Sequence, residues 1–408
     1  MTRTSRTLNR RTVLAGSAAA IAGAFSTTRS RAQSRALKVG VLLPTSGVQA
    51  VIGQDCMRAV DVGQSVLNDL GYPTLQIVPA DTESNVEVSR SRAERLINDG
   101  ADILIGAFDS GQSSAIAQVA EQKRVPFVIN IAAAPQITEQ GYKFVFRNFP
   151  TAQMIVADAF ANQKEIFSAA GMSPTNVVML HVNDTFGVAM QNSVRAMMPA
   201  FDMPYKIIET IAYDPAAREL SVEIARAKGA DAHALLVVSR LNDAILLTRE
   251  MIKQRWTPQA ILSMGPGWLE EQYLKSLGKL SDGPLSFVPW YDPHKSTSKV
   301  LEAAMVKRYP GLNLNTNHVY TFEALLIAAD AYKRTGVADI KLLTDAIRTT
   351  NIAENVTTGP GISFNAKGQN DKLKNSAIQN RNGKLLVVAP KSAAVATVAY
   401  PLKSFRSR

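Results

Sequence analysis

The chain of 408 residues is poor in the residue types that carry redox, metal and nucleophilic chemistry. It has one cysteine and four histidines. A single cysteine excludes an internal disulfide, and the histidines lack the spacing of a metal site. Cys56 falls in a predicted amphipathic helix, where a small core residue is favoured over a nucleophile. We therefore expect no metal and no enzymatic activity.

Sequence motifs for nucleotide binding and ester hydrolysis are also absent. No G-x-G-x-x-G or G-x-x-x-x-G-K-[ST] loop occurs, which disfavours nucleotides and leads us to expect no cofactor. No G-x-S-x-G nucleophile elbow occurs either. No run approaches the roughly 20 apolar residues that a membrane-spanning helix needs, so we expect no direct insertion into a membrane.

The net charge of +11 comes largely from the start of the chain. The first 32 residues contain six arginines and no acidic residue, so without them the charge falls by six to +5. That mild charge disfavours nucleic acid as a partner. Residues 9–14 form a twin-arginine pattern, Asn-Arg-Arg-Thr-Val-Leu, followed by a short apolar stretch and Ser30-Arg31-Ala32. Residues 1–32 are therefore predicted to be a signal peptide for the periplasm, used by the twin-arginine or the general secretory route.

Strand and helix patterns alternate along the rest of the chain. Apolar runs at 37–43, 75–78, 103–105 and 125–131 are separated by amphipathic helical patterns at 55–70, 87–98 and 113–121. After a run at 144–150, a second array predicts strands at 176–181, 205–210, 234–238 and 260–263, with helices between them. Such alternation is typical of an α/β fold with parallel sheets. We predict two doubly wound parallel-sheet lobes.

Three polar or proline-rich stretches are candidate linkers, near Asn148, Ser286 and Thr358. Three crossings would make both lobes discontinuous. Lobe 1 would comprise residues 33–148 and 287–357, and lobe 2 residues 149–286 and 358–408. Lobes joined by a three-crossing hinge can close on a ligand, and the cleft between them is a natural binding site.

The loop that follows the strand at 103–105 is a candidate for one side of that site. Parallel sheets bind ligands at the carboxyl ends of their strands, and the helix after this loop begins with free backbone N–H groups. Asp109 and Ser110 can either hold a small polar ligand there or only cap the helix. The loop by itself leaves both interpretations open.

Several short motifs, taken in order, resemble those of periplasmic ligand-binding proteins. They include Leu43-Pro44-Thr45-Ser46-Gly47, Val125-Pro126-Phe127-Val128 and Asp184-Thr185-Phe186-Gly187. The similar group is the branched-chain amino-acid-type (Leu/Ile/Val-binding-protein-like) receptors of ABC transporters. The resemblance extends from residue 37 to a late predicted strand at 384–389. It implies a type I periplasmic binding protein, a monomer that delivers a small solute to permease and ATPase subunits in the inner membrane.

The resemblance also implies binding residues. Ser110 stands where the family has a serine for the ligand carboxylate, and Ala132 and Ala133 stand in the next loop, where backbone groups contribute. Phe186 matches an aromatic wall, with core packing as the alternative. Gly267 occupies the place of the acidic residue that holds an amino acid's ammonium group.

Further candidates are less specific. Asp109 can replace the missing acid, or only cap a helix. Arg240 follows a strand end and can clamp a carboxylate, or be a solvated charge at the rim. Trp268 falls in a loop near the predicted cleft and is a candidate ligand contact, because exposed tryptophans commonly mark binding sites. Hinge positions are predicted at Asn148, Trp290 and Thr358.

The glycine at position 267 shapes the expected ligand. A buried charge without a partner costs about 3–5 kcal/mol, so an α-amino acid should bind poorly. We expect an aromatic or other organic carboxylate, or an amide. Two alternatives remain at this point, namely a sensory ligand-binding module of the same fold and an exported α/β enzyme.

Overall fold

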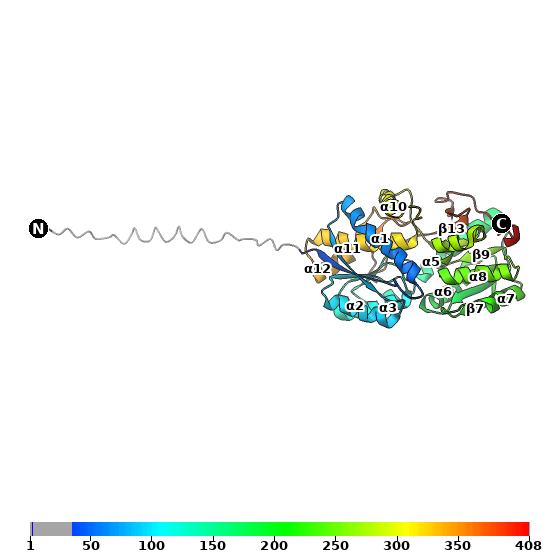
Figure 1. Cartoon of the computed structure of the whole chain (residues 1–408), viewed down its shortest axis with the longest axis horizontal. Coiled ribbons are helices and arrows are strands. Elements are labelled where there is room, and N and C mark those ends of the chain that lie inside the picture. The colour runs from blue at the N-terminus through cyan, green and yellow to red at the C-terminus, as the bar shows by residue number, and fades with distance from the viewer. Residues whose placement is uncertain (1, 3–34, 408) are drawn as a thin grey trace. The chain divides into compact units, whose positions relative to one another are not determined.

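The computed structural model describes residue 2 and residues 35–407. Apart from residue 2, the predicted signal peptide lies outside the described residues. Residues 36–408 form one compact unit, which contains two sheets and the helices that cover them (Figure 1). No helix in the described part of the chain is both long and apolar enough to cross a membrane.

The first lobe is built on a five-stranded sheet with the order β2-β1-β3-β4-β5, in which every pairing is parallel. Helices α2 and α3 cover one face, and α1 lies on the other (Figure 1). The elements are β1 (Leu37–Leu43), α1 (Ala50–Asp69), β2 (Leu75–Asp81), α2 (Val86–Asn98), β3 (Ile103–Gly106), α3 (Ser110–Lys123), β4 (Phe127–Ile129), α4 (Gln136–Glu139) and β5 (Val145–Arg147).

The second lobe is built on a seven-stranded sheet with the order β14-β13-β10-β9-β8-β6-β7. Five strands are parallel, and the last two in sequence, β13 and β14, run antiparallel to their neighbours. The elements are α5 (Ala152–Ala170), β6 (Asn176–Val182), α6 (Thr185–Phe201), β7 (Lys206–Tyr213), α7 (Ser221–Gly229), β8 (Ala234–Val238), α8 (Leu241–Lys253), β9 (Ala260–Ser263), η1 (Pro266–Leu269), α9 (Glu271–Leu277), η2 (Gly278–Ser281), β10 (Leu285–Pro289), β13 (Asn375–Arg381) and β14 (Lys384–Ala389).

Strand β8 shows why its apolar run has no polar alternation. Leu236 and Val238 pack into the core that α5 and α6 complete, whereas Leu235 and Val237 pack into the core under α7 and α8. Successive side chains point to opposite faces of a strand. Because helices cover both faces, every residue of this strand is buried, as expected for a doubly wound sheet.

The chain returns to the first lobe after β10. Helix α11 packs along α1, with α10 and α12 beside them, so these late helices complete the face of the first sheet opposite α2 and α3 (Figure 1). The remaining elements are α10 (Ser296–Arg308), α11 (Thr316–Thr335), α12 (Ile340–Arg348), β11 (Asn351–Ile352), β12 (Ile362–Ser363) and η3 (Phe405–Ser407). The first lobe is therefore discontinuous in sequence.

Two of the predicted crossing points need adjustment. Strand β10 is paired with β9 and β13 up to Pro289, so residues 287–289 belong to the second sheet rather than to lobe 1. Residues 358–370 stay with the first lobe, because β12 pairs with β11 and Gln369 forms a bridge with Arg147. With these two changes, the predicted residue ranges of the lobes remain our proposal.

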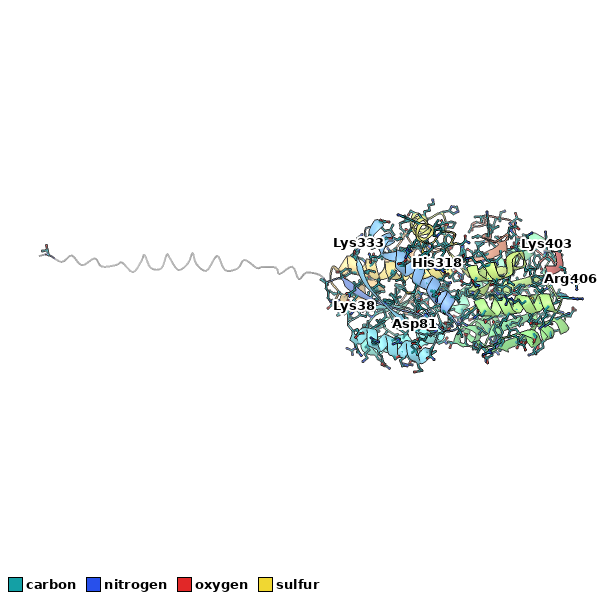
Figure 2. The ribbon with its side chains drawn as sticks, viewed as in Figure 1. Lys38, Asp81, His318, Lys333, Lys403 and Arg406 are labelled. Carbon is teal, nitrogen blue, oxygen red and sulfur yellow. The ribbon has the colours of Figure 1, made fainter. Side chains whose placement is uncertain are left out.

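The strand ends of the first sheet show where a ligand can bind. Lys38, near the start of β1, lies at the end of the sheet that is remote from the second lobe. Asp81, at the end of β2, lies next to the second lobe (Figure 2). The parallel strands therefore direct their carboxyl ends toward the second lobe. That is the edge at which open α/β sheets bind ligands.

Candidate functional site

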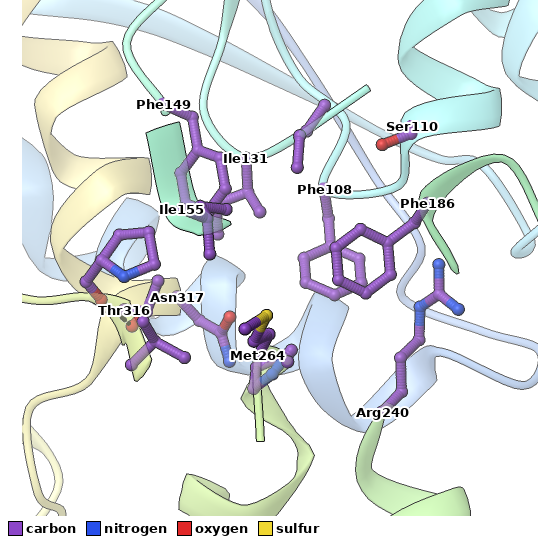
Figure 3. A pocket seen from close by; sticks show the side chains of 16 residues that line it. Phe108, Ser110, Ile131, Phe149, Ile155, Phe186, Arg240, Met264, Thr316 and Asn317 are labelled. Atoms are coloured by element: carbon purple, nitrogen blue, oxygen red, sulfur yellow. Dashed lines mark hydrogen bonds between the residues drawn. The ribbon is translucent and has the colours of Figure 1, made fainter. Parts of the chain in front are cut away.

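A cavity lined by residues of both lobes lies at these strand ends; the space between its atoms amounts to about 540 Å³, part of it open to solvent. Most of the lining side chains are apolar or aromatic (Figure 3). The lining residues are Phe108, Ser110, Ile131, Ala132, Ala133, Phe149, Ile155, Phe186, Arg240, Met264, Gly265, Pro266, Val288, Pro289, Thr316 and Asn317. A concave, mostly apolar lining with a few polar groups is typical of small-molecule sites.

Ser110 is the first residue of α3 and supplies a buried hydroxyl to the cavity. Its Oγ accepts only a long hydrogen bond, 3.3 Å, from the backbone N–H of Ala134. The N–H groups of Ala132 and Ala133 have no acceptor among residues 35–407. A hydroxyl, free N–H groups and a helix N-terminus together form a donor-rich corner that suits a carboxylate.

Arg147 holds that corner in place from behind. It is completely buried, and its guanidinium donates to the carbonyl oxygens of Ala132 at 3.0 Å and Ala134 at 2.7 Å. It also donates to Thr138 and Gln369. Burial lowers the pKa of Arg147 to about 9. The loop after β4 can therefore present its N–H groups to the cavity because its carbonyls are held on the other side.

Asp109 caps α3, as one of the two sequence interpretations had it. One carboxylate oxygen accepts from the backbone N–H groups of Gly111 at 2.8 Å and Gln112 at 3.1 Å. The other oxygen accepts from Arg240 at 2.8 Å and from Gln49 at 3.1 Å. This carboxylate is committed within the protein, so we do not assign it the solute's ammonium group.

Arg240 joins the two lobes rather than standing free for a solute. Its guanidinium donates to Asp109 of the first lobe and to Asp184 of the second, and it lies over the Phe186 ring, 5.3 Å from the centroid. Burial opposes its charged form, but the two carboxylates outweigh burial and raise the pKa of Arg240. Arg240 lines the cavity, but its guanidinium is paired with two protein carboxylates, so its predicted role as a carboxylate clamp stays a prediction.

Aromatic side chains form the cavity walls between these groups. Phe186 stands beside Phe108 on the Arg240 side, and Phe149 stands on the opposite side with Ile155 (Figure 3). Phe149 also packs edge-on against Tyr320, with ring centroids 4.9 Å apart. Aromatic rings in offset or edge contact stabilise one another beyond their buried area. The walls can therefore hold a flat apolar body.

Comparison with known proteins agrees with this architecture. The profile of a family described as "Periplasmic binding protein" matches residues 36–374. The chain belongs to this family. A Leu/Ile/Val-binding protein homolog 7 from Brucella suis is 23% identical over 381 residues, covering 90% of this chain and 94% of the relative.

Solved structures of periplasmic binding proteins share the fold. A leucine-binding protein from Thermotoga maritima superimposes with a TM-score of 0.75 at 20% identity, covering 86% of this chain and 98% of the other. A solute-binding protein of an ABC transporter from R. palustris, solved with benzoate, has a TM-score of 0.74 at 20% identity, covering 90% and 99%. Both confirm the predicted type I fold with two α/β lobes.

Trp268 is not exposed and does not line the cavity of this binding protein. It is fully buried in the second lobe, its ring centroid lies 5.2 Å from that of Tyr273, and its indole N–H donates to Ser239 at 2.9 Å. A short 3₁₀ helix, η1, turns the ring inward, which the sequence pattern did not predict. The expected ligand contact of Trp268 is therefore corrected to a core role.

Gly267 also lies outside the cavity lining, and its environment explains the glycine. A Cβ atom at this position would lie 2.2 Å from the carbonyl oxygen of Arg240. No larger residue, and hence no acid, fits there without a backbone shift. The neighbours Gly265 and Pro266 line the cavity instead, so the sequence prediction placed the right loop but the wrong residue.

The predicted hinge residues lie together at the crossings. The backbone N–H of Thr358 donates to the carbonyl of Trp290 at 2.9 Å, and Asn148 accepts from Asn370 at 2.8 Å. Sequence analysis missed Glu323, a fully buried carboxyl that accepts from Asn148 and from the N–H groups at 356 and 357. Burial raises the pKa of Glu323. Their role in hinge motion remains a proposal.

A second buried polar group that the sequence did not reveal lies beside the cavity. Asn317 of α11 donates through Nδ2 to Glu270 of the second lobe at 3.0 Å and contacts Asp55 of α1 at 3.4 Å. Burial and the nearby Asp55 raise the pKa of Glu270 to about 8. Nε2 of His318, a buried residue of α11 that is labelled in Figure 2, lies 3.0 Å from Asp55.

Within residues 35–407, no group of three or more His, Cys, Asp or Glu side chains is arranged to hold a metal ion. The one cysteine, Cys56, is fully buried. Burial raises the pKa of its thiol far above the ordinary value, which keeps the sulfur protonated and unreactive.

Proposed function

We propose that this protein is the periplasmic receptor of an ABC importer for a small organic carboxylate with an apolar body. Its role is to capture the solute between the lobes and deliver it to the permease. The observation that carries the proposal is the composition of the cavity, whose lining includes three phenylalanines and no aspartate or glutamate. The only charged lining residue, Arg240, is neutralised by protein carboxylates.

The donor-rich corner supports the carboxylate assignment. The Ser110 hydroxyl and the N–H groups of Ala132 and Ala133 offer hydrogen bonds without a full charge. Hydrogen bonds to an ionised group are stronger than those between neutral groups. We infer that the carboxylate lies against this corner and the rest of the solute against Phe186 and Phe149.

An α-amino acid is disfavoured by the same arrangement. Its ammonium group needs an acceptor, and a buried charge without one costs about 3–5 kcal/mol. Asp109 is already held by α3, Gln49 and Arg240. The similar structures are of a leucine-binding protein and of a benzoate complex, and the apolar cavity without acidic residues favours the second class of ligand for this chain.

The contacts between the lobes support capture by closure. Asp109 and Arg240 come from different lobes and meet beside the cavity. A solute that contacts both lobes binds the closed form more tightly and shifts the equilibrium toward it. No step of this process requires a chemical change in the solute, so we propose binding without catalysis.

A thermal-shift screen of the purified protein tests the proposal. The panel contains benzoate, phenylacetate, hexanoate, benzamide and the amino acids leucine, phenylalanine and glutamate. A solute at a hundredfold excess over its Kd stabilises the protein by about 2.7 kcal/mol. We expect shifts with one or more carboxylates that lack an α-ammonium group. A shift confined to amino acids, or none at all, would contradict the proposal.

A further inference from the structure

Asn317 is a polar residue placed where an apolar wall would be expected. It lies in the first turn of α11, is 1% exposed, and lines the cavity. In the view of the cavity it lies on the side opposite Ser110, next to Thr316 and Met264 (Figure 3). The cavity therefore has polar groups at two ends, with aromatic walls between them.

The orientation of the Asn317 amide is fixed by its surroundings. Its Nδ2 faces the carboxyl groups of Glu270, at 3.0 Å, and Asp55, at 3.4 Å. Burial opposes ionisation of Asp55, but the nearby His318 and Asn315 outweigh burial and lower the pKa of this carboxyl. Asp55 is therefore ionised and can only accept a hydrogen bond, so the amide nitrogen must face it. Reversing the amide would direct its oxygen toward the ionised Asp55 and lose that hydrogen bond.

This orientation leaves the amide oxygen of Asn317 without a donor. Oδ1 is buried and has no hydrogen-bond partner among the described residues. The neighbouring hydroxyl of Thr316 cannot serve, because it donates to the carbonyl of Pro289 at 2.7 Å. Buried polar atoms without a partner are uncommon and call for an explanation.

We propose that Oδ1 of Asn317 accepts a hydrogen bond from the solute. The donor is a hydroxyl or N–H group at the end of the solute remote from its carboxylate. This inference rests on the proposed function and deepens it, since it defines a two-ended ligand with a carboxylate at Ser110, an apolar body, and a distal donor at Asn317.

The same amide links recognition of the donor to contact between the lobes. Asn317 and Asp55 belong to the first lobe and Glu270 to the second. A solute donor that fixes Oδ1 also holds Nδ2 toward Glu270. A solute without that donor still occupies the cavity, but leaves the acceptor unpaired, and binding sites reject such analogues.

Matched solutes test the inference by isothermal titration calorimetry. The pairs are benzoate with 3-hydroxybenzoate and 4-hydroxybenzoate, phenylacetate with 4-hydroxyphenylacetate, and hexanoate with 6-hydroxyhexanoate. The compound 4-fluorobenzoate serves as a control of similar size that cannot donate. We expect at least one hydroxylated member to bind ten times more tightly than its parent, and 4-fluorobenzoate to bind no better than benzoate.

Two substitutions assign the preference to Asn317. Asn317→Ala removes the acceptor, so the hydroxylated solute should bind less than twofold more tightly than its parent. Asn162→Ala is the matched control, because it removes a buried amide of α5 that does not line the cavity, so the preference should persist. If Asn317→Ala fails to fold, Asn317→Ser, which shortens the side chain and withdraws the amide oxygen, takes its place with the same expectation.

The outcomes separate the two proposals. Equal affinities within every pair, or a preference that survives Asn317→Ala, would overturn the role of Asn317 while leaving carboxylate binding intact. If no carboxylate of the panel binds to the wild-type protein, the proposed function fails, and the inference fails with it. A preference lost in Asn317→Ala and kept in Asn162→Ala supports the inference.

Discussion

The ion pair between Asp109 and Arg240 should determine how tightly the protein holds its solute. Asp109→Asn removes the charge at the one carboxylate that reaches Arg240 from the other lobe. The substitution keeps an oxygen that can still accept from Gly111 and Gln112, and asparagine caps helices as well as aspartate does. The change therefore tests the contact between the lobes without removing the cap of α3.

The size of the effect follows from burial and geometry. The atoms Nη2 of Arg240 and Oδ2 of Asp109 are 2.8 Å apart, and the two side chains are 10% and 12% exposed. Hydrogen bonds to charged groups contribute about 1.5–3 kcal/mol after desolvation. If the pair forms only in the closed protein, the solute must supply that free energy in the variant. Its Kd should then rise roughly 10- to 150-fold.

Calorimetry with the tightest solute from the screen measures this effect. Asp61→Asn is the control, because Asp61 pairs with Arg308 at 2.9 Å within the first lobe and both side chains are well exposed. Exposed pairs contribute about 0–1 kcal/mol, and this one does not reach the second lobe. Equal Kd values for Asp109→Asn and Asp61→Asn would refute a role of the Asp109–Arg240 pair in closure.

Three further predictions follow from single side chains. Ser110→Ala should weaken carboxylate binding about tenfold without changing the ligand-free melting temperature, because Asp109 supplies the cap of α3. An equal fall in melting temperature with and without ligand would instead point to a structural role. Phe186→Leu should cost aromatic acids roughly 2- to 10-fold more affinity than aliphatic acids, measured by calorimetry. Burial raises the pKa of Glu270 to about 8 from 4.5, so the folded protein retains a proton that the unfolded chain releases. The stabilisation from Glu270 is therefore complete below about pH 4.5 and is lost as the pH rises through about 8. Glu270→Gln should flatten the fall in melting temperature between pH 5 and 8. If the slope of melting temperature against pH is unchanged in this variant, Glu270 does not cause the fall.

The parallel parts of the fold were predictable because their strands are buried on both faces. Strands β1, β8 and β9 have the boundaries that the apolar runs predicted. Strand β10 was taken for a linker because of its prolines, yet Pro289 ends the strand, where the missing N–H does least harm. Strand β13 reads Asn-Ser-Ala-Ile-Gln-Asn-Arg and was missed, because its buried amides are satisfied by distant partners.

The site was predictable where a motif fixes a backbone position, and not where a side chain acts across a long sequence distance. Ser110, Ala132 and Phe186 follow strand ends, and all three line the cavity. Arg147 sits at the end of a short strand, and nothing local shows that it reaches the carbonyls of the loop after β4. Asn317 reads as an ordinary helix start, and only the fold brings Glu270 to it.

The proposed preference for an anionic solute follows from the way the cleft combines these long-range contacts. On one side of the cavity, the lobes are joined by the ion pair between Asp109 and Arg240. On the other side, they are joined by the hydrogen bond from the Asn317 amide to the buried carboxyl of Glu270. Both contacts use up the acidic groups that a cationic solute would need. An anionic solute, by contrast, needs only the uncharged donors near Ser110, which remain available. In the proposed function, the protein therefore closes without competing for the solute's carboxylate, and the contacts proposed to favour closure act against an ammonium group.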